Sequence, residues 1–145
     1  MSAGPTPSSE AARQRMVRQR SRDTGLELEL RRALHRRGLR YRIHQRLVPG
    51  SRRTVDIVFG PSRVAVEVRG CFWHRCPEHQ TAPRANAEWW AEKLAANVAR
   101  DVEGERLLEA AGWKLIVVWE HELRGGAERA ADRIAEVVAS RRPQR

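Results

Sequence analysis

The sequence predicts a single α/β domain in which a mixed β-sheet is flanked by helices. Segments with helical and strand periodicity follow one another in the order helix, three strands, helix, strand, helix. Residues 54–59 and 63–69 form the second and third predicted strands, and only the turn Gly60-Pro61-Ser62 separates them. A long helical segment lies between the third and fourth strands, which is typical of a βαβ crossover. At 145 residues the chain is long enough for one domain with its own core.

The first helix is predicted to begin near Thr24, because Thr24 and Glu27 have the spacing of a capping box and apolar residues then recur at helical period. Gly38 fits the position just beyond a helix end. Residues 39–43 alternate apolar and basic side chains, as a half-buried strand does. Pro49-Gly50-Ser51 then marks a loop before the second strand.

The third strand alternates two sets of side chains. One set is Val64, Val66 and Val68, and the other is Ala65, Glu67 and Arg69. Glu67 and Arg69 are therefore expected side by side on one face of the sheet.

The second half of the chain continues with a helix from about residue 87 to residue 111, which Asn86 is placed to cap and Gly112 to end. Four residues spaced four apart are expected to share one face of this helix: Trp90, Leu94, Val98 and Val102. The apolar run at 113–119 predicts a buried strand, and residues 127–140 predict the last helix.

Charge and composition limit the classes of partner. The net charge of +10 comes from 28 Lys and Arg against 18 Asp and Glu, and it favours a polyanion such as nucleic acid. A basic solvated surface with no partner is the alternative. The N-terminus has no apolar segment of a signal peptide, and no run approaches the roughly 18 apolar residues that span a bilayer. We therefore expect a cytoplasmic, nucleoid-associated protein that binds no membrane.

The domain limits follow from local composition. Residues 1–15 are predicted to be a disordered leader, residues 16–140 the folded domain, and residues 141–145 a basic tail. We expect a monomer.

Both cysteines of the chain lie in one loop together with histidines. Cys71, Cys76 and His79, with His121 directly after the last predicted strand, supply thiolate and imidazole ligands of the kind that Zn²⁺ prefers. With four protein ligands the zinc would be structural. The alternative is a pair of buried thiols beside surface histidines.

Acidic residues on neighbouring strands suggest a second metal site. Asp56 on the second strand and Glu67 on the third could together hold a hard cation such as Mg²⁺, which prefers carboxylate oxygens. Such a cation could polarise a phosphodiester and activate water. The alternative is that these acids are solvated or form salt bridges.

Several stretches combine unusual residue types at fixed spacing. They are S-R-D-T-x-x-E-L at 21–28, G-C-F-W-H at 70–74, C-P-x-H at 76–79, N-A-E-W-W-x-E-K-x-x-x-N at 86–97 with R-D after it, and A-G-W-K-L-I-V-V-W-E-H at 111–121. Together they resemble the very short patch repair (Vsr) endonucleases, over residues 16–124. The resemblance implies a restriction-endonuclease-like fold and a Mg²⁺-dependent enzyme. That enzyme would nick one strand of double-stranded DNA beside a T:G mismatch left by deamination of 5-methylcytosine.

The resemblance also implies roles for individual residues. Asp56 would be the Mg²⁺ ligand, with the backbone carbonyl of Val68 as its partner. His74 would be the general base for the attacking water, a role that suits an imidazole because it titrates near neutral pH. Glu27 would assist near the metal-bound waters. The alternatives are that His74 supports the zinc loop and that Glu27 only caps its helix.

Aromatic side chains near the zinc loop are the predicted contacts to the mismatch. By resemblance, Phe72, Trp73 and Trp90 would enter the DNA stack, where a T:G pair is already poorly stacked. Lys93 and Asn97, one and two turns after Trp90, would contact the mismatched pair. The alternatives are that Phe72 and Trp73 pack under the loop and that Lys93 is solvated. The other tryptophans are assigned to the core: Trp89, Trp113 and Trp119.

The chain departs from the family pattern around the metal strand. Val55 stands where a proline is usual, and residues 51–54 extend the loop before it. Arg69 stands where the family commonly has His or Asp, and Glu67 replaces an apolar residue. An arginine cannot act as a base, but it can stabilise a phosphorane or the leaving oxygen, so Arg69 is included with Glu67 among the catalytic candidates.

These departures leave two other functions open. One is a related nuclease of different DNA specificity in a restriction-like defence system. The other is a zinc-containing module that binds mismatched DNA without cutting it.

Overall fold

The computed structural model describes residues 25–78 and 84–143. The predicted leader and Thr24 therefore lie outside the described residues, as do His79 and the end of the basic tail. The elements after the first helix are β1 (Arg42–Gln45), β2 (Val55–Phe59), β3 (Val64–Arg69), α2 (Ala87–Ala110), β4 (Lys114–Trp119), α3 (Glu120–Leu123) and α4 (Glu128–Ser140). The first helix covers residues 25–36. Within this described part, none of the helices is long and apolar enough to cross a membrane.

The four strands form one mixed sheet in the order β1-β2-β3-β4. β1 pairs antiparallel with β2, and β2 pairs antiparallel with β3. β3 and β4 are parallel, because α2 carries the chain back to the edge at which β3 began. The predicted α/β class and the crossover are thus confirmed.

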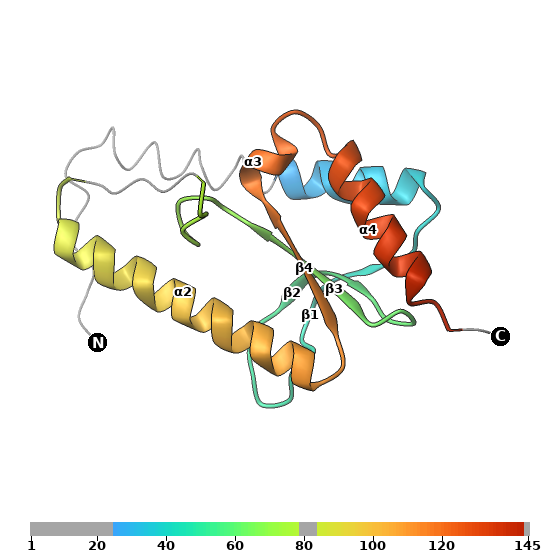
Figure 1. Cartoon of the computed structure of the whole chain (residues 1–145), viewed down its shortest axis with the longest axis horizontal. Coiled ribbons are helices and arrows are strands. Elements are labelled where there is room, and N and C mark those ends of the chain that lie inside the picture. Colours follow the sequence, from blue (N-terminus) through green and yellow to red (C-terminus); the bar gives the residue numbers. More distant parts are fainter. Residues whose placement is uncertain (1–24, 79–83, 144–145) are drawn as a thin grey trace.

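Helices cover both faces of the sheet (Figure 1). Residues 25–36 and α4 pack on one face, where Leu30, Ile57 and Ile134 belong to the larger apolar core. α2 lies on the other face, where Leu108 packs with Val58 in a smaller core. β3 runs between the two layers, and for this reason both of its faces are largely buried.

Helix α2 presents a different face to the sheet than its apolar spacing predicted. Val102 is 59% exposed, whereas Asp101 is only 5% exposed. A spacing of four residues turns the side-chain direction by about 40° each time, so three such steps leave the starting face. A spacing of seven turns it by only about 20°. The buried residues of α2 are spaced by seven: Leu94, Asp101 and Leu108.

Two glycines set the helix ends where the sequence predicted them. Gly38 has φ of +75° and Gly112 has φ of +88°, a left-handed conformation that suits glycine. The Leu39 amide donates to Leu34 O, and the Trp113 amide donates to Leu108 O, which satisfies carbonyls of the last turn in each helix. The Leu39 amide is used in this bond, and the first strand begins at Arg42, three residues later than predicted.

Asn86 precedes α2 as predicted but does not cap it with its side chain. It adopts φ of 57°, and its side chain makes no cap hydrogen bond. A short helix that the sequence did not indicate, α3, follows β4 directly and carries His121.

Candidate functional site

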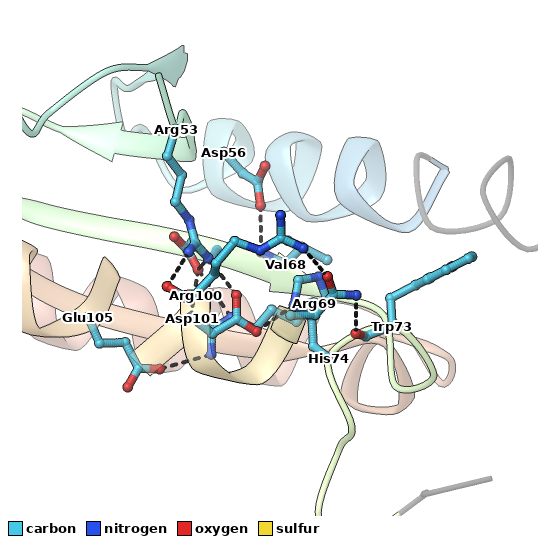
Figure 2. Close-up of polar contacts among 11 residues, drawn as sticks. Arg53, Asp56, Val68, Arg69, Trp73, His74, Arg100, Asp101 and Glu105 are labelled. Carbon is cyan, nitrogen blue, oxygen red and sulfur yellow. Dashed lines mark hydrogen bonds and ion pairs between the residues drawn. The ribbon is translucent and has the colours of Figure 1, made fainter. Parts of the chain in front are cut away.

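Strands β2 and β3 separate at Asp56. Ile57 lies opposite Val66 at the end of their paired segment. One residue earlier, Oδ2 of Asp56 accepts a hydrogen bond from the backbone N–H of Val68 at 2.7 Å. The carboxylate therefore sits directly against the end of β3, and Figure 2 shows it pointing to Val68.

The environment of Asp56 disfavours its negative charge. Burial raises the pKa of Asp56 from the ordinary 3.8 to about 6, and the nearby acids Glu27 and Glu67 add to the increase. The Val68 N–H and His44 act in the opposite direction but do not compensate. Among the described residues no ion pair neutralises Asp56, and a bound cation would favour its ionised form.

Three elements bring potential metal ligands to this point. Glu27 from the first helix, His44 from β1 and Asp56 from β2 place one ligand atom each within 4.8 Å of one another. Oε2 of Glu27 lies 3.4 Å from Nε2 of His44 and 3.7 Å from Nε of Arg31. The two carboxylates fit the expected Mg²⁺, and the imidazole adds a nitrogen donor of the kind that later transition metals prefer.

The sequence did not indicate His44 as a site residue. It follows the predicted first strand and has φ of 50°, a left-handed conformation that is uncommon outside glycine. Its approach to Glu27 depends on how β1 and the first helix pack. A histidine at a strand end carries no signal for that packing.

A second cluster of ligands joins the loop after β3 to helix α3. The Sγ atoms of Cys71 and Cys76 each lie 3.4 Å from Nδ1 of His121. Burial raises the pKa of the Cys71 thiol to about 11, and the adjacent Cys76 contributes. Two buried thiols that converge on one imidazole fit a thiolate-binding metal, which would stabilise the deprotonated form.

The remaining contacts of this cluster support its geometry. Nε2 of His121 lies 3.2 Å from Oε2 of Glu78, so a carboxylate can orient the imidazole ring. The Cys71 amide donates to Oε1 of Glu120 at 3.2 Å, which ties the loop to α3 a second time. His79, the fourth predicted ligand, lies outside the described residues.

His74 contacts helix α2. Its Nδ1 lies 2.6 Å from Oδ2 of Asp101 (Figure 2). An ionised carboxylate only accepts hydrogen bonds, so Nδ1 carries the proton and Nε2 keeps a lone pair when the ring is neutral. This arrangement gives His74 the tautomer that a general base requires.

Asp101 is shared between His74 and an arginine from the loop before β2. Nη2 of Arg53 donates to Oδ1 of Asp101 at 2.6 Å, and Nη1 donates to the carbonyl of Arg100 at 2.7 Å. Although burial opposes ionisation, His74 and Arg53 hold the pKa of Asp101 below its ordinary value. Asp101 is thus an ionised, buried carboxylate with a partner on each oxygen.

The structure brings Glu67 and Arg69 together in a buried ion pair. Oε2 of Glu67 accepts from Nη2 of Arg69 at 2.7 Å and from Nε at 3.1 Å, while Nη1 of Arg69 donates to Glu105 at 2.9 Å. Burial lowers the pKa of Arg69, but both acids outweigh that effect and raise it. Glu67 is therefore turned towards Arg69, and it is not part of the Glu27–His44–Asp56 cluster.

The predicted DNA-contacting aromatics form one cluster. The ring centroid of Phe72 lies 5.0 Å from that of Trp73 and 5.4 Å from that of Trp90, and all three side chains are half-buried. Trp89 packs edge-on against Trp90 at 4.9 Å and lies in neither apolar core, unlike its core assignment. Trp113 packs against the α2-side core as expected.

Lys93 and Asn97 occupy different environments on α2. Lys93 is exposed. Asn97 is half-buried and its amide donates to the backbone carbonyl of Trp73 at 3.1 Å, so it fixes the loop that carries Phe72 and Trp73. Arg100 also donates to the side chain of Asn97.

Sequence reasoning missed Arg53 and Asp101 as parts of this site. Asp101 is part of the R-D that follows one of the quoted motifs, but the predicted apolar face of α2 does not include it. The spacing Leu94, Asp101, Leu108 is a usable signal, because it places an acid in the centre of a buried helix face. Arg53 lies in the loop that departs from the family pattern.

Known proteins are similar in sequence to most of this chain. Residues 8–80 match the family model of the DNA mismatch endonuclease Vsr. The chain is 42% identical over 120 residues to the type II nicking enzyme V.NaeI of Lentzea aerocolonigenes, covering 81% of this chain and 72% of the relative. It is also 42% identical over 118 residues to the type II nicking enzyme V.XorIIP of Xanthomonas oryzae pv. oryzae, covering 80% and 84%.

A third relative carries the name of the matched family. The DNA mismatch endonuclease Vsr of Escherichia coli (strain K12) is 36% identical over 107 residues, which cover 72% of this chain and 66% of the relative.

Proposed function

Because the chain belongs to the family of the DNA mismatch endonuclease Vsr, we propose that it nicks one strand of double-stranded DNA beside a T:G mismatch with the help of Mg²⁺. Its membership of this family shows that the chain is a DNA-nicking endonuclease. The mismatch and the metal are the further parts of the proposal. The net charge of +10 supports a DNA substrate.

The position of Asp56 is the observation on which the proposal depends. Its carboxylate lies against the end of β3, burial raises its pKa to about 6, and Glu27 and His44 each place a possible ligand atom within 4.8 Å of it. A bound cation would offset the negative charge of the neighbouring carboxylates, which their burial makes unfavourable. Asp56, with the carbonyl of Val68, would hold Mg²⁺, Glu27 would assist near the metal-bound waters, and His44 is a further candidate ligand. Bound there, the ion would supply positive charge beside the scissile phosphate and lower the pKa of a coordinated water.

His74 is the proposed general base. Asp101 holds Nδ1, so Nε2 is directed away from α2 and can take a proton from the attacking water. Arg69 is held by Glu67 and Glu105. Its proposed contribution is a fixed positive charge at the end of β3, and Glu67 keeps that charge in place.

The Cys71, Cys76 and His121 cluster is the proposed structural zinc site, with His79 as fourth ligand. Zinc there would join the loop after β3 to α3 and supply a rigid mount for Phe72, Trp73 and His74. Asn97 supports the same loop from α2 through the carbonyl of Trp73.

Phe72, Trp73 and Trp90 are the proposed wedge at the mismatch. Phe72 packs edge-on against both Trp73 and Trp90, and the rings of Trp73 and Trp90 are tilted at 55° to each other, so the three half-buried rings lie together. Unstacking a poorly paired T:G step costs less than unstacking a Watson–Crick step, which would favour insertion at the mismatch. Lys93 is exposed nearby on α2 and is the proposed contact to the pair itself. One copy of the chain supplies all of these groups, so we propose a monomer.

A nicking assay tests the proposal directly. Zinc-loaded protein is mixed with end-labelled hairpin duplexes that differ only in one pair, T:G, T:A or C:G, in the presence of Mg²⁺ or EDTA. We expect a nick in the T:G duplex only, dependent on Mg²⁺. Asp56→Asn should bind the T:G duplex normally and leave it uncut. Cutting by Asp56→Asn at the normal rate would place the metal site elsewhere.

The relatives named type II nicking enzymes favour a second candidate function. This is a strand-nicking nuclease with different DNA specificity, as part of a restriction-like defence system. Cleavage of all three duplexes at equal rates would support it over the T:G proposal. Tight binding to the T:G duplex without any nick, at full metal occupancy, would instead support a mismatch-binding module.

A further inference from the structure

Arg53, in the loop before β2, donates hydrogen bonds to two residues of helix α2, Arg100 and Asp101. We propose that Arg53 is a positioning residue, which fixes His74 for DNA cleavage by acting through Asp101, and that Gly104 provides the space for it. The inference rests on the proposed nicking function and adds two residues to it.

Both ends of the Arg53 guanidinium are anchored. Nη2 donates to Oδ1 of Asp101 at 2.6 Å, and Nη1 donates to the Arg100 carbonyl at 2.7 Å (Figure 2). The planar fork of an arginine fixes direction as well as distance when both arms are used. The same group lies 3.6 Å from Oε2 of Glu67, so it also faces the ion pair at the end of β3.

Gly104 is placed to admit this guanidinium. A Cβ atom at position 104 would lie 2.9 Å from Nη1 of Arg53 and 3.2 Å from its Cζ. Glycine is unfavourable relative to alanine in the interior of a helix, and α2 runs for 24 residues around this position. Close packing of Arg53 against the bare backbone gives a reason for glycine here.

Asp101 transmits the position of Arg53 to His74. Its two oxygens have different partners, Arg53 on Oδ1 and His74 on Oδ2. Asp101 is only 5% exposed, so the carboxylate has little solvent to turn towards. With Arg53 holding Oδ1, the direction of Oδ2 is fixed, and with it the orientation of the imidazole ring.

The arrangement also joins two parts of the proposed active centre. Arg53 lies three residues before Asp56, the proposed metal ligand, and Asp101 holds His74, the proposed base. The clamp between Arg53 and α2 therefore sets the separation of strand β2 from the loop of His74. A displacement of about 1 Å at reacting groups can lower a rate by on the order of 100-fold.

Four variants of the full-length, zinc-loaded protein test the proposal: Arg53→Gln, Arg52→Gln, Gly104→Ala and the double variant Arg53→Gln/Gly104→Ala. Arg52 is exposed in the same loop, so Arg52→Gln controls for the loss of one positive charge near DNA. For each variant, kcat and KM are measured on the T:G duplex, and thermal unfolding shows that the protein is folded at the assay temperature.

We expect Arg53→Gln to lower kcat by on the order of 10-fold or more, with KM close to that of Arg52→Gln. Gly104→Ala should also lower kcat, because it displaces the guanidinium without removing any charge. In the double variant kcat should fall no further than in Arg53→Gln. In the wild type, Gly104→Ala should lower the unfolding temperature, because the added Cβ displaces Arg53. In the Arg53→Gln background it should raise the unfolding temperature, because only the higher helix propensity of alanine then acts.

The inference is overturned, and the nicking function stands, if the wild type nicks and Arg53→Gln keeps kcat within twofold of Arg52→Gln. Independent, multiplying effects of Arg53→Gln and Gly104→Ala would also overturn it. If the wild type with full metal occupancy nicks none of the duplexes, the proposed function fails, and the positioning role fails with it.

Discussion

His74 and Asp101 lie 27 residues apart in the chain, yet Nδ1 of one is 2.6 Å from Oδ2 of the other. The loop after β3 supplies the histidine and the buried face of α2 supplies the acid. This pair decides which ring nitrogen of His74 is available to a water molecule. It therefore links the packing of α2 on the sheet to the proposed chemistry.

Asp101→Asn tests that link. Asparagine keeps the shape but removes the charge that favours the Nδ1–H tautomer, and we expect the single-turnover nicking rate to fall by about 10- to 100-fold, as for other residues that orient a functional histidine. Affinity for the T:G duplex should stay within a few fold. Asp132→Asn, at an exposed acid on α4, is the control for the loss of one negative charge. Equal rates for the two variants would remove Asp101 from the site.

Asp56 should reduce the stability of the metal-free protein at neutral pH. Its pKa rises from 3.8 to about 6 on folding, so the folded state binds the proton more tightly than the unfolded state. Relative to the ionised carboxylate, the protonated carboxyl of Asp56 stabilises the fold. This stabilisation is complete below pH 3.8 and is lost as the pH rises through about 6. In EDTA, Asp56→Asn should therefore stabilise the protein at pH 7.5 by at most about 3 kcal/mol, and much less at pH 4.

Urea unfolding of both proteins at the two pH values measures this difference. Mg²⁺ should raise the stability of the wild type at pH 7.5 and leave that of Asp56→Asn unchanged, because only the wild type is expected to bind the ion. An equal stability difference at pH 4 and pH 7.5 would contradict a buried, charge-sensitive Asp56.

His44 should contribute a nitrogen ligand at the proposed catalytic metal site. Imidazole favours later transition metals such as Co²⁺ over Mg²⁺, so His44→Ala should weaken Co²⁺ binding to zinc-loaded protein by about 10-fold and change Mg²⁺ binding less. Absorption spectroscopy of bound Co²⁺ gives the affinity. His35→Ala, at an exposed histidine of the first helix, is the matched control. The same Co²⁺ affinity in all three proteins would show that His44 only lies near the acids.

The thiol cluster should hold zinc in the purified protein. We expect about one zinc per chain by elemental analysis, and loss of that zinc in Cys76→Ala. Chelation should lower the unfolding temperature, because the loop after β3 would lose its tie to α3. His79→Ala tests the fourth ligand and should lower zinc affinity. Folded, reduced protein without zinc would rule out the ligand assignment.

Trp73 should contribute to recognition of the mismatch. Trp73→Ala should reduce the preference for T:G over T:A duplexes by roughly 1–3 kcal/mol, the scale of one stacking contact. Equilibrium binding of fluorescent duplexes measures this preference. Trp113→Phe, in the α2-side core, is the control for a tryptophan lost from packing. If discrimination is unchanged in Trp73→Ala, the ring serves the loop and not the DNA.

The placement of β2 beside β3 and the crossover could be predicted because they depend on local pattern. Alternation of valines defines β3, the Gly-Pro-Ser turn places β2 beside it, and glycines at 38 and 112 end two helices. The cysteines could likewise be found, since their spacing lies within one loop. The exposure of Val102 could not be predicted in this way. Residues spaced by four turn progressively around a helix, and Asp101, a polar residue, lies on the face of α2 that is buried against the sheet.

By itself, the sequence determined the α/β class and the family, and it predicted candidate sites at Asp56 and Cys71, because local periodicity and short motifs carry that information. Only the tertiary structure decided which partners these residues have. His44 of β1 lies beside Glu27 of the first helix, and Arg53 and His74 both contact the buried carboxylate of Asp101. The physical reason is that a buried charge is unfavourable without a partner, and the packing of elements distant in sequence decides which opposite charge lies within hydrogen-bond distance.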